Sequence, residues 1–232
     1  TDNILYVNKN ATSGNKSGNS WANATPELAD ALIYAKLKDN YTTANPLKIF
    51  VAKGTYKPLY SPEGGERFGT NQARANTFSL VKNVQVYGGF AGIEANLAAR
   101  DLSLIANKSI LSGDIGIVSD RSDNNYHIVV SSGNLETALL NGFTITGGYA
   151  NEENGYYYLN SVLVSGGSGG GITIYNSSPT LINVSIINNY AKYSGGGVYA
   201  TSNTYPFSSY PKLTNVVISG YTTANATAVR IQ

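Results

Sequence analysis

The 232-residue chain contains no cysteine and a single histidine. The absence of cysteine excludes a disulfide framework, a thiolate metal site and a cysteine nucleophile, and one histidine alone argues against a zinc site. Charged residues make up only 13% of the chain, and the formal net charge is +2. Nucleic-acid-binding proteins concentrate Lys and Arg, so we expect no nucleic-acid partner. No apolar run reaches the roughly 18 residues that a spanning helix needs, so we expect no membrane-spanning segment.

The chain begins at Thr1 without a signal peptide. We therefore expect a leader to have been removed and the chain to be part of a longer one. Its length suits one large domain, and we treat residues 1–232 as a single unit.

Glycine is abundant, and two glycine triplets stand 26 residues apart, at 169–171 and 195–197. Each triplet is followed by a β-branched residue, Ile172 or Val198. In a β-solenoid, successive coils lie about 4.8 Å apart, and their corners need sharp turns without side chains, which glycine provides. The triplets therefore predict stacked corners, and a flexible Gly-Ser linker is the alternative.

Three segments repeat within residues 139–232: "GFTITGGYA" from Gly142, "NVSIINNYA" from Asn183 and "NVVISGYTT" from Asn215. Apolar and polar residues alternate in each, which indicates a strand with one buried face. The intervals fit a unit of about 22 to 26 residues that carries insertions. The two insertions are 151–163 and 202–210.

Weaker strand patterns occur earlier, at 48–56, 77–90, 108–115 and 126–133. One segment differs, since Thr25 can cap a helix and Pro26 can occupy its first position. Within this region, residues 20–38, one helical face carries Leu28, Ala31, Leu32 and Ala35. The sequence predicts an all-β, single-stranded parallel β-solenoid. It also predicts one N-terminal amphipathic helix, over residues 25–37, that covers the open end of the solenoid.

Several motifs in order, among them "IFVAKGTYKP", "VYGGFAG", "ILSGDI", "NGFTITGG" and "GGGITIYNSSPTLINVSI", resemble right-handed parallel β-helix proteins of the pectin-lyase-like type. The resemblance is strongest to surface and secreted repeat proteins of bacteria, and the "GGGI" and "SIINN" elements are similar to repeats of polymorphic outer-membrane adhesins. It runs from about residue 4 to 220. It implies right-handed coils, an asparagine ladder at Asn183 and Asn215 with Gly142 in the preceding coil, and a location outside the cell or on the outer membrane of a bacterium.

The segment "SGDIGIVSDRSDNNYH" at 112–127 is the densest in polar residues. Asp114, Asp120 and Asp123 offer the oxygen ligands that calcium takes, although their spacing is not that of an EF-hand. The alternative is a surface loop whose Asx side chains bind their own backbone. A calcium site is thus one of two interpretations.

Both insertions are rich in aromatic residues. Insertions in solenoids emerge on one face and often bind partners, and exposed tyrosine suits stacking on sugars or contacts with proteins. The alternative is that the rings pack as covers on the coils. The candidate ligand-binding residues are Tyr156, Tyr157, Tyr158, Tyr205, Phe207 and Tyr210.

The expected function is a binding, adhesive or structural role, with a glycan or a host or surface protein as partner. The alternative is a carbohydrate-active enzyme, because this fold carries lyases and hydrolases as well as adhesins. A lyase of this fold would use a basic residue beside acidic ones, and the candidates are Arg100, Asp101, Lys108 and Arg121. The scarcity of carboxylates after Asp123 argues against a hydrolase, which needs a carboxylate pair.

Overall fold

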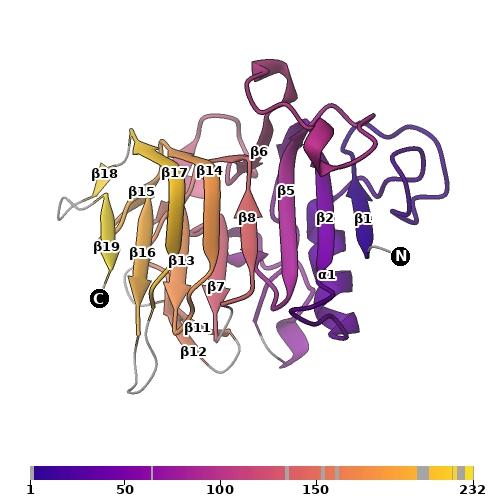
Figure 1. Ribbon diagram of the computed structural model, residues 1–232. Helices are drawn as coiled ribbons and strands as arrows, with labels where there is room; N and C mark the ends of the chain where they lie inside the picture. The colour runs from indigo at the N-terminus through magenta and orange to yellow at the C-terminus, as the bar shows by residue number, and fades with distance from the viewer. Residues whose placement is uncertain are drawn as a thin grey trace.

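The computed structural model describes residues 3–63, 65–133, 136–152, 155–159, 162–202, 209–220, 222–223 and 228–231. These residues form one α-helix, α1 (Leu28–Lys38), and otherwise mostly β-strands (Figure 1). Short 3-10 helices lie at Gly65–Arg67, Ala73–Ala75, Leu97–Ala99, Ile105–Asn107 and Arg121–Asp123. Every sheet except one two-stranded hairpin is built from parallel pairs.

The largest sheet, sheet A, runs along the length of the molecule. Its strands are β1 (Ile4–Val7), β2 (Leu47–Ala52), β3 (Gly54–Tyr56), β5 (Val84–Phe90), β6 (Ser109–Ser112), β8 (Leu139–Asn141), β9 (Phe143–Thr146), β14 (Thr180–Ile187) and β17 (Lys212–Ser219). β14 pairs with β8 through its first half and with β9 through its second half. Thus β8 and β9 together occupy one strand position of the sheet. The neighbouring strand position is occupied by β5, which pairs with β8, and β6, which pairs with β9, and residues 91–108 form an insertion between β5 and β6.

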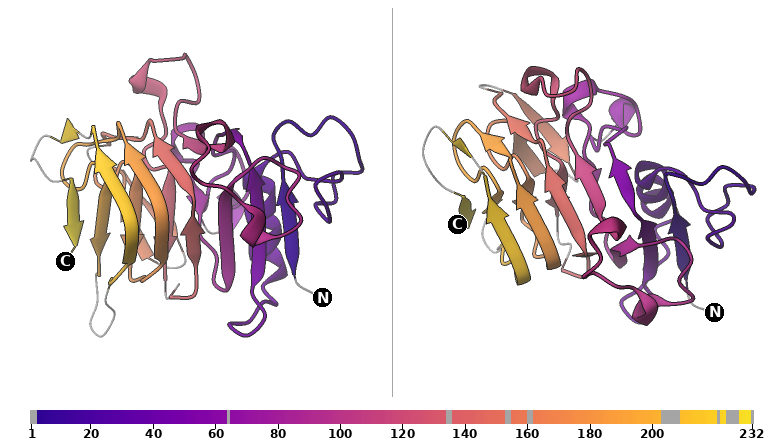
Figure 2. Two further views of the ribbon diagram at one scale, coloured as in Figure 1. Left: turned by 45° about the horizontal axis from the view of Figure 1, so that its top comes forward. Right: turned by 90° about the horizontal axis from the view of Figure 1, so that it is seen from above.

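Two smaller parallel sheets complete the coils. Sheet B contains β4 (Phe78–Ser79), β7 (Val129–Ser132), β13 (Ile172–Tyr175), β16 (Val198–Thr201) and β19 (Val229–Ile231), and sheet C contains β10 (Tyr149–Ala150), β15 (Tyr190–Ala191) and β18 (Thr222–Thr223). From β8 onward the chain visits sheets A, C and B in the same order in each successive turn. Figure 2 shows the strands stacked in this curled arrangement. The fold is therefore mostly β, with parallel strands in curled sheets that are compatible with a β-solenoid.

The core lies between sheets A and B. Val184 faces inward in β14 beside Val216 of β17, and Ile172 faces inward in β13 between Val129 and Val198. Like residues stack because each turn repeats the inward positions of the one before. This stacking explains why the three repeats have the same apolar pattern.

The glycine triplets form stacked corners, as the sequence predicts, and are not a flexible linker. Gly169 and Gly195 have left-handed φ angles of 77° and 64°. A Cβ on Gly170 would lie 2.0 Å from the carbonyl oxygen of Tyr190, and one on Gly171 would lie 2.6 Å from that of Gly197. The first glycine of a triplet thus makes the turn, and the others allow neighbouring coils to approach.

The helix begins later than the sequence suggests. The N-cap of α1 is Glu27, whose side chain makes no capping hydrogen bond, so the prediction that Thr25 caps the helix is wrong. The reason is that the backbone of Thr25 pairs with β1: its N–H donates to the Tyr6 carbonyl at 3.0 Å and its carbonyl accepts from the Asn8 N–H at 2.9 Å. The predicted inward face is confirmed, because Leu28, Ala31, Leu32 and Ala35 are buried.

The helix α1 lies at the N-terminal end of the stack, where its buried face joins the main core and contacts β1 and β2 of sheet A and β4, the end strand of sheet B. It does not cover the backbone edge of β1. The outer edge of β1 is instead covered by the segment before the helix, since the Tyr6 N–H donates to the Gly18 carbonyl at 2.7 Å. The Trp21 ring packs on that of Tyr6 at 4.8 Å between centroids. The N-terminal edge is therefore protected by a loop.

The first insertion contains an antiparallel hairpin, β11 (Tyr156–Leu159) and β12 (Val162–Ser165). Leu159 and Val164 pack on the outer surface of sheet B against Val130 and Tyr175. The hairpin is thus a cover over one side of the coils.

Candidate functional site

A ladder of asparagines marks the middle of sheet A, as the resemblance implies. Asn183 of β14 and Asn215 of β17 lie opposite each other and have left-handed φ angles of 52° and 51°. The Asn215 Nδ2 donates to Asn183 Oδ1 at 2.6 Å, and the Asn183 Nδ2 donates to Asn141 Oδ1 at 3.3 Å. Because a left-handed residue interrupts the alternation of an extended strand, Val184 faces the core and Ser185 faces outward.

Gly142 takes the ladder position in the preceding turn, with a φ of 84°. A Cβ there would lie 2.8 Å from the Arg100 Nη1 and 3.0 Å from the Leu102 Cδ2. The Gly88 carbonyl oxygen lies 2.8 Å from the same point, so the neighbouring strand and the insertion 91–108 together leave room for glycine at this position. The position explains why the ladder of asparagines ends at this turn.

Arg100 fastens the insertion to sheet A. Its Nη1 donates to the Gly88 carbonyl at 2.8 Å and its Nη2 donates to Asn141 Oδ1 at 3.0 Å. The guanidinium also lies over the Tyr87 and Phe90 rings, 5.6 Å from each centroid. Burial lowers the pKa of Arg100, partly opposed by Tyr87. These contacts fix the insertion as a wall beside the ladder.

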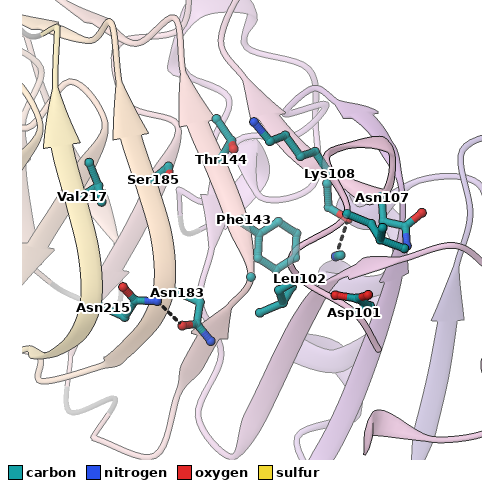
Figure 3. Close-up of a pocket in the computed structure, with 14 residues that line it drawn as sticks. Asp101, Leu102, Asn107, Lys108, Phe143, Thr144, Asn183, Ser185, Asn215 and Val217 are labelled. Carbon is teal, nitrogen blue, oxygen red and sulfur yellow. Dashed lines mark hydrogen bonds between the residues drawn. The ribbon is translucent and has the colours of Figure 1, made fainter. Parts of the chain in front are cut away.

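The wall and the ladder enclose a groove of about 210 Å³ on the outer surface of sheet A (Figure 3). Its floor is formed by sheet A, and the insertion 91–108 adds apolar side chains at one side. The floor carries Thr144, Asn183, Ser185, Asn215 and Val217, and the insertion carries Leu102 and Leu104. Phe143 also borders the groove, but its side chain is 2% exposed and belongs to the core. Thr144, Ser185 and Val217 occupy one register column of β9, β14 and β17.

Two charged residues of the insertion also line this groove. Asp101 accepts hydrogen bonds from the N–H and hydroxyl of Ser103 at 2.9 and 2.6 Å, which lower the pKa of its carboxyl group. Lys108 extends its ammonium group toward Thr144 (Figure 3). Of the residues named for a lyase, Asp101 and Lys108 thus line the same groove, and Arg100 holds the insertion from which they come, whereas Arg121 lies in another loop, as an exposed residue. Among the described residues, Asp101 is the carboxylate that the groove presents.

The aspartates of the predicted calcium loop each bind backbone N–H groups. Asp114 accepts from Ser119 at 3.3 Å, Asp120 from Ser122 at 2.8 Å, and Asp123 from Ile117 at 2.6 Å. In the described parts of the chain, no three His, Cys, Asp or Glu side chains gather into a group that could hold a metal ion. These contacts are those of an Asx-rich loop whose side chains bind its own backbone. One carboxylate oxygen each of Asp114 and Asp123 is nevertheless buried without a hydrogen-bond partner, so calcium binding stays a prediction to be tested.

The predicted aromatic ligand-binding residues that the structure describes do not line the groove. The backbones of Tyr156 and Tyr157 belong to β11, while Tyr158 and Tyr210 are 64% and 70% exposed. Tyr205 and Phe207 fall outside the described residues. The first insertion leaves between sheets C and B and the second between sheets B and A. A shared aromatic surface stays a prediction.

The one histidine is a buried structural residue. His127 precedes β7, and its Nδ1 lies 2.9 Å from the Gly169 carbonyl and 3.1 Å from the Thr173 hydroxyl. Burial lowers its pKa to about 4, against the effect of its backbone hydrogen bonds. His127 is therefore held inside the coils by hydrogen bonds.

Comparisons of the chain with protein-family models, with curated proteins and with solved structures found no match. No helix among the described residues is long and apolar enough to cross a membrane.

Proposed function

We propose that this chain is a right-handed parallel β-helix module that binds an extended glycan in the groove on sheet A. The observation that carries the proposal is the groove floor, on which the hydroxyl groups of Thr144 and Ser185 and the amide groups of Asn183 and Asn215 recur on neighbouring turns. The motif resemblance supports the right-handed form, the adhesin-like role and a location on a bacterial surface.

The lining matches the chemistry of a sugar. Asparagine, serine and threonine side chains each donate and accept hydrogen bonds, as sugar hydroxyl groups do. Leu102 and Val217 offer apolar surfaces to the C–H faces of sugar rings, and the Val217 side chain is 54% exposed. Because strands in a sheet repeat at about 4.8 Å, a ligand that runs along the stack meets like groups on neighbouring turns. Such an arrangement favours a polymer of repeated units.

The distribution of carboxylates favours binding over hydrolysis. A glycoside hydrolase needs a pair of carboxyl groups across the scissile bond, and the groove presents Asp101 among the described residues. A polysaccharide lyase is the second candidate, because Lys108 and Asp101 line one groove and Lys108 could act as a base. Incubation with uronate polymers separates the two candidates. Loss of cleavage in a Lys108→Ala variant would identify the lyase, and absence of cleavage with retained binding would identify the module.

The binding experiment uses two matched variants. Thr144 and Thr146 are half-buried residues of β9 on the same outer face, and only Thr144 lines the groove. We expect Thr144→Arg to fill the groove and lower the affinity for any glycan found on an array by about tenfold or more, because a misfit at the centre of a site removes several contacts. Thr146→Arg should retain the affinity. Equal affinities of both variants and the parent, with unchanged melting temperatures, would rule out the groove as the site.

A further inference from the structure

The loop between β6 and β7, residues 113–128, buries side-chain oxygens that receive no hydrogen bond. Figure 2 shows this loop projecting beyond the strands of the stack. In the part of the chain that the structure describes, one buried oxygen each of Asp114, Asp123, Asn124 and Asn125 has no hydrogen-bond partner. Buried polar atoms are normally hydrogen-bonded, and these four atoms are all acceptors. The loop therefore lacks donors or a cation to match its buried oxygens.

The carboxylates of Asp114 and Asp123 enter the same short stretch of backbone. The Ser119 N–H donates to Asp114 Oδ2 at 3.3 Å, and the Ile117 N–H donates to Asp123 Oδ2 at 2.6 Å. The Asp123 carboxylate lies against Gly116, where a Cβ would be 2.2 Å from Oδ2 and 3.2 Å from Oδ1. Each aspartate thus binds the backbone through Oδ2 and leaves Oδ1 buried without a donor. Buried negative charge is costly unless it is compensated.

Asn124 brings a neutral oxygen to the base of this loop. Its Nδ2 donates to the Gly147 carbonyl at 2.7 Å, and the residue is 4% exposed. A Cβ on Gly147 would lie 3.6 Å from that Nδ2 and 3.3 Å from the Asp114 backbone nitrogen. The Asn124 amide therefore lies beside the start of the loop, with its oxygen buried and unpaired. Asn125 is anchored elsewhere, because its Nδ2 donates to the Ala73 carbonyl at 3.0 Å.

We propose that Asp114, Asp123 and Asn124 bind a calcium ion at the base of the loop. Their Oδ1 atoms supply two carboxylate ligands and one amide ligand, and water completes the six to eight oxygens that calcium takes. Magnesium fits less well, because it demands a near-ideal octahedron. Asp120 is not part of this set, since none of its oxygens is buried without a partner and it accepts from the Ser122 N–H at 2.8 Å.

The site is separate from the groove on sheet A, because none of its three ligands lines that groove. Calcium binding and glycan binding can therefore fail independently. With three ligands from the protein, we expect a dissociation constant of about 10⁻⁴ to 10⁻³ M, the range of extracellular calcium modules. The ion would fasten the projecting loop to the corner of the coil at Gly147.

Thermal melting of the parent protein is the first test. It is measured with EDTA, with calcium and with magnesium, at an ionic strength held constant with sodium chloride. Calcium at about 10 mM, roughly ten times the weaker expected dissociation constant, should raise the melting temperature by about 3 °C or more. Magnesium at the same concentration should have a smaller effect.

Asp123→Asn separates a calcium site from a loop that binds only its own backbone. Asparagine can still accept from the Ile117 N–H, but the charge is lost. We expect this variant to lose most of the calcium-dependent shift and, in EDTA, to melt at or above the parent temperature, because its repulsion with Asp114 is relieved. Asp120→Asn is the matched control and should keep the shift of the parent. A loop without calcium would instead make Asp123→Asn less stable by the same amount in EDTA and in calcium.

NMR titration with calcium locates the ion. The amide signals of Ile117 and Ser119 should move and saturate with one dissociation constant, because the two carboxylates hold these N–H groups. Three results would overturn the proposal. The first is equal melting of the parent in calcium and EDTA, which leaves water as the donor to these oxygens. The second is an equal shift with magnesium, and the third is an equal loss of the shift in Asp120→Asn and Asp123→Asn.

Discussion

Replacement of Asn183 separates two contributions to the stability of the ladder: the side-chain hydrogen bonds of Asn183 and its tolerance of a left-handed backbone. In Asn183→Ala, the hydrogen bonds with Asn215 and Asn141 are lost, each worth about 1 kcal/mol. Asn141 Oδ1 keeps the Arg100 donor at 3.0 Å, so no buried acceptor is left without a partner. Alanine must also adopt the left-handed backbone of residue 183, which costs roughly a further 1 kcal/mol relative to a residue that tolerates it. We expect a loss of about 2 to 3 kcal/mol in the free energy of unfolding.

Asn183→Gly is the matched variant, because glycine adopts the left-handed conformation freely. It should lose the hydrogen bonds but avoid the backbone strain, and be more stable than the alanine variant by about 1 kcal/mol. Urea unfolding followed by circular dichroism measures both, with Ser185→Ala as a control on the same strand. The reasoning is refuted if the alanine variant lies within about 0.5 kcal/mol of the parent, the range of ordinary surface changes, or if glycine is no better than alanine.

Four other predictions test separate features. Gly170→Ala should lower the free energy of unfolding by about 1 to 3 kcal/mol or more, because its Cβ would meet a backbone carbonyl of the next coil; an unchanged urea midpoint would show that the coils can move apart. The pKa of His127 is lowered from 6.5 to about 4. The stability that the buried neutral imidazole contributes is therefore fully present above about pH 6.5 and is lost as the pH falls from there through 4. His127→Asn should flatten the stability profile over this interval, and parallel profiles would contradict this assignment. Chelation by EDTA should lower the melting temperature if the aspartate loop binds calcium, and an unchanged melt would leave the Asx-loop interpretation. The double variant Tyr157→Ala, Tyr205→Ala should weaken ligand binding with little loss of stability if the insertions bind, whereas a loss of several degrees without a binding defect would make these rings packing covers.

Features set by local sequence were predicted well. The glycine triplets and the repeats starting at Gly142, Asn183 and Asn215 identified positions that the structure places in register. These predictions succeeded because each depends on backbone conformation and on the neighbouring copy of the same motif. The buried face of the helix was also correct, since its periodicity is local.

Features that depend on distant contacts were missed. Thr25 has the composition of a helix cap, but its backbone pairs with β1, and no local signal reveals that partner. The groove depends on Arg100 reaching Gly88 and Asn141, so the insertion 91–108 could not be placed as its wall. The one available signal was the loss of asparagine at the Gly142 position of an otherwise regular ladder. Glycine there indicated that another side chain occupies the space.

The central claim is that the groove on sheet A is the ligand-binding site. Its most direct test is NMR chemical-shift mapping of the parent protein titrated with a glycan identified on the array. We expect chemical-shift changes concentrated at Lys108, Thr144, Asn183 and Ser185, with Tyr158 of the hairpin unaffected. Shifts at Tyr158 and Tyr210 with an unchanged groove would contradict it and assign binding to the aromatic insertions.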